Sequence, residues 1–144
     1  MRNLLALIAL AIALGPGPAK AEQPYAATLY KNPQCGCCEG HADYLRENGF
    51  EVTVKPTHDL PLIKRQHEVP GALEGCHTTL IDGYVVEGHV PVSTLLRLLS
   101  ERPSIKGISL PGMPAGSPGM TGAKAGPFTI YEITDGPANV YAVE

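Results

Sequence analysis

Residues 27–38 read Ala-Thr-Leu-Tyr-Lys-Asn-Pro-Gln-Cys-Gly-Cys-Cys, and they predict the elements that open the fold. Residues 27–30 have the composition of a strand, and residues 31–34, with their Asn-Pro pair, predict a turn. The cysteines are then expected to open a helix that runs to about Asn48, with apolar residues at helical spacing from Cys38. A strand, a turn and a helix that begins with Cys-x-x-Cys are therefore expected in direct succession.

Strand-like and helix-like segments alternate along the chain up to residue 101. They are a strand at 50–54, a helix from 60 to about 68 with Asp59 as its cap, strands at 78–81 and 84–87, and a helix from 92 to about 101. Asp82-Gly83 separates the third and fourth strands, and an Asp-Gly pair between two strands is a strong hairpin signal. The order strand, helix, strand, helix, hairpin, helix, opened by Cys-x-x-Cys, predicts a single α/β domain with a thioredoxin-like layout.

The chain changes character after Gly107. Residues 107–126 are rich in Gly and Pro and include Met113 and Met120, and we interpret them as a Gly/Pro/Met-rich loop that closes over the domain. The two methionines are interpreted as a hydrophobic plug and lid, with ligation of a soft metal by their thioethers as the alternative. Residues 128–133 and 139–143 alternate again and predict a C-terminal β-hairpin.

The N-terminus has the features of an export signal. Arg2 supplies a positive charge, residues 4–14 are apolar without interruption, and Ala19-Lys-Ala21 fits the small-x-small cleavage pattern. A membrane-spanning helix needs about 20 apolar residues, and this run is too short for one. We therefore expect residues 1–21 to be a signal peptide, residues 22–144 to form one domain, and the mature protein to be periplasmic without a stable membrane anchor.

The charge of the chain bears on its partners. The formal net charge is −3, and the mature chain is more acidic because Arg2 and Lys20 leave with the signal. Nucleic-acid binding needs a basic footprint, and no basic stripe with interleaved aromatic residues is present in the sequence. No nucleic-acid partner is therefore expected, whereas an acidic surface mildly favours cations.

All four cysteines, Cys35, Cys37, Cys38 and Cys76, lie after the signal. At a helix N-terminus the free N–H groups and the helix dipole favour the thiolate over the thiol. The thiolate is both the nucleophile of disulfide exchange and the form that ligates metals. An even cysteine count in an exported protein is also typical of disulfides. Number and position alone therefore leave a metal site and a redox-active dithiol open.

Cys37 favours the metal site. A dithiol oxidoreductase needs only Cys35 and Cys38, and Cys37 adds a third sulfur within one turn. Neighbouring thiolates repel one another unless a cation lies among them, and soft thiolates select Cu(I), zinc or iron–sulfur clusters. In a thioredoxin-like fold the loop before the third strand passes beside the cysteine helix, so Cys76 is expected to bring a fourth sulfur there. The alternative is a Cys35–Cys38 disulfide, with Cys76 a bystander or paired to Cys37.

Histidines are expected to join the cysteines. His77 directly follows the last cysteine and is a candidate ligand or hydrogen-bond donor to one. His89 precedes the last helix, at an end that points toward the cysteines in this fold. His41 lies on the cysteine helix, where it could ligate, although a single helix histidine is usually solvent-facing. His58 and His67 are expected at the surface.

Five short motifs follow one another along residues 27–120. They are Tyr30-Lys-Asn-Pro-Gln-Cys-Gly-Cys-Cys38, Asn48-Gly-Phe50, Cys76-His-Thr78, Glu87-Gly-His-Val-Pro91 and Pro111-Gly-Met-Pro-Ala-Gly-Ser-Pro-Gly-Met120. Together they make the sequence resemble the CopG-type copper-resistance proteins, a family of small periplasmic metal-binding proteins.

The resemblance implies a thioredoxin-like fold, several copper ions bridged by cysteine sulfur, and a role in copper tolerance that includes interconversion of Cu(I) and Cu(II). It implies metal ligation by Cys35, Cys37, Cys38 and Cys76, with His77 and His89 as the candidate histidines. His41 stands where relatives are expected to have an aromatic residue, so no role is carried over to it.

We therefore expect a periplasmic copper-binding protein, with zinc as the alternative metal. A copper efflux system or another periplasmic copper protein is its expected partner. The alternative function is a thiol–disulfide oxidoreductase with Cys35 as nucleophile and Cys38 as resolving thiol.

Overall fold

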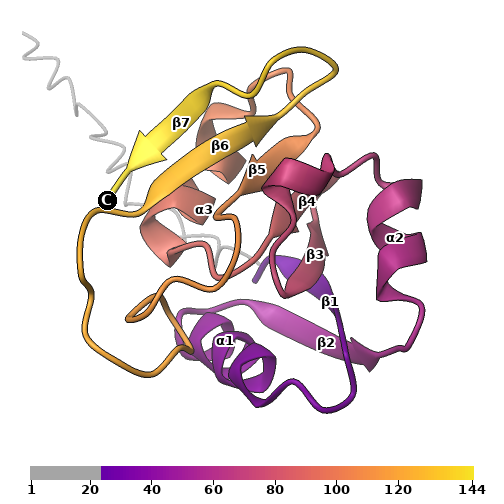
Figure 1. Ribbon diagram of the computed structural model, residues 1–144, viewed down its shortest axis with the longest axis vertical. Coiled ribbons are helices and arrows are strands. Elements are labelled where there is room, and N and C mark those ends of the chain that lie inside the picture. The colour runs from indigo at the N-terminus through magenta and orange to yellow at the C-terminus, as the bar shows by residue number, and fades with distance from the viewer. Residues whose placement is uncertain (1–23) are drawn as a thin grey trace, which may run out of the picture.

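The first unit of the fold is a strand, a helix and a strand, β1, α1 and β2 (Figure 1). The structure, a computed structural model, describes residues 24–144. β1 (Ala26–Lys31) leads into α1 (Gly36–Glu47), and β2 (Glu51–Pro56) returns to pair parallel with β1. α1 begins directly after Cys35, close to where the sequence predicted the start of a helix.

The middle of the chain follows the predicted order of elements. After β2 come α2 (Leu60–Gln66), the short 3₁₀ helix η1 (Gly71–Leu73), β3 (His77–Ile81), β4 (Tyr84–Glu87) and α3 (Val92–Glu101). β3 and β4 pair antiparallel. Both residues of the turn between them, Asp82 and Gly83, have positive φ (48° and 86°), as the tight turn of a two-residue hairpin requires.

The seven strands form one mixed sheet in the order β2-β1-β3-β4-β5-β6-β7. Its last three strands are β5 (Gly107–Ser109), β6 (Thr129–Ile133) and β7 (Val140–Val143). β5 pairs parallel with β4 and antiparallel with β6, and β6 pairs antiparallel with β7. The sequence had placed Gly107–Ser109 in a loop, which was wrong, because a three-residue strand has no recognisable periodicity and is defined by its neighbours in the sheet.

The two faces of the sheet bury different side chains. Leu45 of α1 and Leu95 of α3 belong to the main core cluster, together with Val86 of β4. The neighbouring strand residue, Val85, instead packs with Leu73 of η1 in a second cluster. Because successive side chains of a strand point to opposite faces, α1 and α3 lie on one side of the sheet and η1 lies on the other.

A long loop, residues 110–128, joins β5 to β6, and we call it the strap. It passes beside α1 before it returns to the sheet (orange in Figure 1). Gly119 of the strap has a φ of 81° and lies directly on the backbone of Gly40 and His41, where a Cβ would approach the His41 nitrogen to 2.4 Å. Met113 is 58 % exposed, so the predicted hydrophobic plug was wrong for this methionine.

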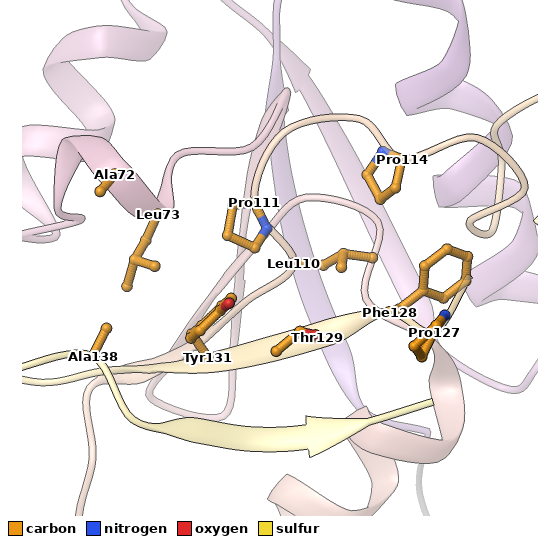
Figure 2. A pocket seen from close by; sticks show the side chains of 10 residues that line it. All are labelled: Ala72, Leu73, Leu110, Pro111, Pro114, Pro127, Phe128, Thr129, Tyr131 and Ala138. Atoms are coloured by element: carbon orange, nitrogen blue, oxygen red, sulfur yellow. The ribbon is translucent and has the colours of Figure 1, made fainter. Parts of the chain in front are cut away.

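An open apolar cavity of about 530 Å³ lies between η1, the strap and β6 (Figure 2). Its walls include Leu73, Leu110, Phe128 and Tyr131, and no cysteine or histidine lines it. This cavity is therefore separate from the residues to which the sequence assigns chemistry.

Two expectations concern membranes and export. Among residues 24–144, no helix is both long and apolar enough to cross a bilayer. The signal peptide expected at residues 1–21 lies outside the described residues.

Candidate metal centre

Three cysteines lie at the start of α1. Cys35 occupies the N-cap position, and Cys37 and Cys38 lie in the first turn. Leu29 of β1 packs against Cys38 and holds this end of the helix on the sheet. Cys35 and Cys38 form a disulfide with their Cα atoms 5.5 Å apart, and the Sγ of the free Cys37 lies 3.3 Å from that of Cys35.

The fourth cysteine arrives from the loop before β3. The Cys76 Sγ lies 3.6 Å from the Cys38 Sγ, and the four sulfur atoms lie within 4.8 Å of one another. The loop thus passes beside the cysteine helix, where the sequence placed it.

Two buried histidines face the same sulfur atom. The His89 Nε2 lies 2.8 Å and the His77 Nδ1 3.3 Å from the Cys76 Sγ. Cys38, Cys76, His77 and His89 form a second group whose ligand atoms also lie within 4.8 Å of one another. We call the whole set the Cys–His cluster, which consists of Cys35, Cys37, Cys38, Cys76, His77 and His89.

Burial sets the protonation of the cluster. It is the main cause that lowers the pKa of both His77 and His89, so both imidazoles are neutral and keep a lone pair. Burial, helped by the neighbouring Cys37 thiol, raises the pKa of Cys76 to about 12. Without a cation, Cys76 is therefore a protonated thiol, and a bound metal ion would have to displace its proton.

His41 lies next to the cluster and is fully buried. Its Nδ1 is 3.0 Å from the His77 Nε2, and its Nε2 is 3.1 Å from the Val90 carbonyl oxygen. The solvent-facing position considered usual for such a histidine was therefore wrong. The strap covers α1 at this point, where Gly119 lies on the backbone of Gly40 and His41. The sequence predicted a loop that closes over the domain, but not that it would lie on this histidine.

A buried ion pair supports the loop that carries Cys76, and sequence reasoning missed it. Lys64 of α2 and Glu87 of β4 are paired, with the Thr78 hydroxyl donating to the same carboxylate. The Gly75 N–H donates to Glu87 (2.9 Å), and the Gly75 carbonyl accepts from Lys64 (3.0 Å). The pair thus holds both polar groups of Gly75, the residue before Cys76. The one available signal was a carboxylate at the end of an otherwise apolar strand.

The strap completes the surroundings of the cluster. The His89 Nδ1 donates to the Pro118 carbonyl oxygen at 2.6 Å. Gly112 of the strap donates to the Glu74 carbonyl at 3.0 Å. A cavity of about 260 Å³ opens here, with Met113 and Cys76 among its lining residues. Cys76 therefore lines the same surface cavity as the exposed thioether of Met113.

The donor set fits a soft metal ion. Four sulfur atoms and two neutral imidazole nitrogens are the ligands that Cu(I) and zinc take in proteins. Cys35 and Cys38 can take part as thiolates only when their disulfide is reduced. The oxidised form described here leaves Cys37, Cys76 and the two histidines as donors.

Comparisons with known proteins give a consistent picture. Two solved structures, named as the copper resistance protein CopG in Form 1 and Form 2, each align with a TM-score of 0.78 and 39 % sequence identity, covering 84 % of this chain and 98 % of theirs. A family model described as "Protein of unknown function, DUF411" matches residues 73–120. No curated protein matches.

Proposed function

This chain belongs to the CopG family of copper resistance proteins, and from that premise we propose that it binds copper, as Cu(I), at the Cys–His cluster. The observation that carries the proposal is the setting of the Cys76 sulfur. A second cysteine sulfur and two neutral imidazole nitrogens lie 2.8–3.6 Å from it. Thiolate and imidazole are ligands that suit copper and zinc, and the family name favours copper.

The helix start offsets part of the charge that thiolates bring. The N-terminus of an α-helix carries the equivalent of about half a positive charge, and Cys35, Cys37 and Cys38 lie there. The remaining negative charge is balanced by the metal itself. Because burial keeps Cys76 a thiol without a cation, copper binding at this sulfur is expected to release a proton.

Reduction of the Cys35–Cys38 disulfide is a condition for the full site. The reduced form offers six donors, and we propose that it is the form that takes up Cu(I). Two overlapping groups of four donors share Cys38 and Cys76, which supports more than one copper ion bridged by sulfur. Interconversion of Cu(I) and Cu(II) at this cluster, with one electron per ion exchanged with a redox partner outside this chain, is part of the same proposal.

We also propose that the fold is thioredoxin-like and that the protein works in the periplasm. The parallel β1-α1-β2 unit, the antiparallel β3–β4 hairpin and the following α3 support this fold, with the strap and the β6–β7 pair as a C-terminal extension. The signal-like residues 1–21 support export. Copper bound there would pass to an efflux system or another periplasmic copper protein.

The oxidoreductase alternative is not favoured. Exchange between Cys35 and Cys38 has no use for two histidines beside Cys76, and the two related structures are named for copper resistance.

Anaerobic titration of the reduced mature chain with Cu(I), and in parallel with zinc, tests the proposal. Mass spectrometry of the intact complexes counts the bound ions. We expect Cu(I) to be retained in preference to zinc, and the disulfide form to retain fewer Cu(I) ions than the reduced form. Failure to retain copper, together with rapid reduction of insulin by the dithiol, would overturn it.

A further inference from the structure

His41 has both ring nitrogens engaged, although it is no member of the Cys–His cluster. On one side its Nε2 meets the Val90 carbonyl oxygen at 3.1 Å, and on the other its Nδ1 meets the His77 Nε2 at 3.0 Å. The ring is fully buried. Neither nitrogen is therefore free to take a metal ion while these two contacts persist.

The Val90 carbonyl fixes where the hydrogen of His41 lies. A carbonyl oxygen only accepts hydrogen bonds, so the nitrogen that faces it, Nε2, must carry the hydrogen. An imidazole buried away from any counter-charge is neutral, so the Nδ1 of the fully buried His41 has a lone pair. That lone pair must accept from the His77 Nε2.

The tautomer of His77 follows from that of His41. Since its Nε2 donates to His41, the neutral His77 ring has its lone pair on Nδ1. Nδ1 is the atom that lies 3.3 Å from the Cys76 Sγ. A single backbone carbonyl thus determines the tautomers of two histidines and presents a ligating nitrogen to the cluster.

His89 also presents a lone pair to the Cys76 sulfur, but from Nε2 instead of Nδ1, and its tautomer is fixed by a different carbonyl. Its Nδ1 donates to the Pro118 carbonyl oxygen, so its lone pair is on Nε2, which lies 2.8 Å from the Cys76 Sγ. Two imidazoles therefore present lone pairs to one sulfur atom, each held by its own carbonyl. The hydrogen bonds of His41 can therefore be removed while the hydrogen bond between His89 and Pro118 stays intact.

We propose that His41 is a positioning residue, which holds His77 in the Nε2–H tautomer and leaves its Nδ1 free to ligate a metal ion. The tautomer of His77 is independent of the proposed function. Only the ligation of copper by its Nδ1 rests on that function. Partners that orient a metal-binding histidine typically account for a 10–100-fold difference in metal affinity, and this range sets the expected effect of removing His41.

Nitrogen-15 NMR of the reduced, metal-free protein tests the tautomers directly. We expect the proton of His77 on Nε2 and that of His89 on Nδ1 in the wild type. In His41→Phe, which keeps an aromatic ring but removes both hydrogen bonds, we expect the His77 proton to move to Nδ1, where it can pair with Cys76, and the His89 proton to stay. His41→Asn, whose Oδ1 can accept near the position of the lost Nδ1, should restore the wild-type tautomer.

Cu(I) affinity, measured by competition with a chelator, is the second readout. We expect a loss of about 10–100-fold in His41→Phe, a smaller loss in His41→Asn, and no change in His58→Phe, a control at an exposed histidine. The proposal is overturned if wild-type His77 carries its proton on Nδ1, or if His41→Asn loses as much affinity as His41→Phe. If His41→Phe fails to fold, the spectra of the wild type and of His41→Asn still establish the tautomer of His77. Because the spectra need no metal, failure of copper binding would leave the tautomer result standing and would point instead to the proposed function.

Discussion

Cys76 is the residue at which the two halves of the cluster meet. Cys38 approaches it from the α1 side, and His77 and His89 from the side of β3 and α3. Cys37 adds a further sulfur, which lies 3.3 Å from that of Cys35. The role of each sulfur can therefore be tested by removing one at a time.

Cys37→Ser distinguishes the metal site from the dithiol. A disulfide between Cys35 and Cys38 does not need Cys37, whereas a four-sulfur Cu(I) site does, because a serine hydroxyl is a poor ligand for a soft metal. We expect fewer bound Cu(I) ions, or at least tenfold weaker binding, while thiol titration still finds the Cys35–Cys38 pair. Unchanged copper binding in this variant would argue against a site that uses all four sulfurs.

At this scale the sequence predicted which side chains gather, but not what holds them. Cys76 and His89 could be placed because the expected fold brings their loops to the helix start. The buried positions of His41, Lys64 and Glu87 depend on the strap and on contacts between distant elements, for which the sequence has no local pattern.

Among the elements, the strap is the one that closes the site. Its Gly119 has positive φ and lies against α1, Gly112 has positive φ (70°) with open space around it, and Gly126 has neither constraint. Substitution at these three glycines therefore distinguishes the cost of backbone strain from the cost of a steric clash of the new Cβ.

Alanine at the three positions should therefore give a graded series of stabilities. We expect little change for Gly126→Ala and a loss of about 1–2 kcal/mol for Gly112→Ala, from the left-handed conformation. Gly119→Ala should lose about 1–3 kcal/mol more, because its Cβ has no room against α1. It should also release bound Cu(I) faster, because Pro118 would move away from His89. Urea unfolding and the rate of copper transfer to a chelator measure both effects. Equal behaviour of the Gly119 and Gly126 variants would show that the strap does not pack on α1 as described.

The Lys64–Glu87 pair connects α2 to the hairpin and should dominate the stability of that side. Lys64→Met leaves a buried carboxylate without its counter-charge, and breaking such a pair typically costs about 3–5 kcal/mol. Lys64→Met combined with Glu87→Gln should recover most of that loss, because the amide can still bond to Gly75. Urea denaturation of the single and double variants measures the coupling; additive losses would mean that the two side chains act independently.

Elements with their own periodicity or turn chemistry were predictable and β5 was not. α3 spans Val92–Glu101, where the sequence placed it, because its leucines repeat at helical spacing. The β3–β4 hairpin was predicted from Asp82-Gly83. β5 exists because β4 and β6 lie on either side of it, which is information that a three-residue window cannot contain.

For the whole molecule, the sheet order explains how one site can draw on the entire chain. β1 and β3 are neighbours, so the helix after β1 and the loop before β3 meet at one edge of the fold. The strap leaves β5, which lies two strands beyond β3 in the sheet, and covers α1. The side chains of the candidate metal centre and the strap carbonyl that holds His89 are therefore distributed over residues 35–118.

Export directed by residues 1–21 is the prediction that concerns the whole molecule. When the complete sequence is expressed with a functional secretion system, we expect the mature protein in the periplasmic fraction, beginning at Glu22, because Ala19-Lys-Ala21 fits the cleavage pattern. Mass determination of the intact purified protein checks the N-terminus, and Ala21→Pro serves as the variant that should not be cleaved. An uncleaved chain in the cytoplasm would contradict the periplasmic proposal.

X-ray absorption spectroscopy at the copper edge tests the central claim most directly. For the reduced protein loaded anaerobically with Cu(I), we predict a spectrum of Cu(I) with sulfur as the main neighbour and a minority of imidazole nitrogen. The nitrogen contribution should disappear in the His77→Ala, His89→Ala double variant and stay in His58→Ala. A first shell of nitrogen and oxygen without sulfur, or a spectrum that the double variant leaves unchanged, would contradict copper binding at the Cys–His cluster.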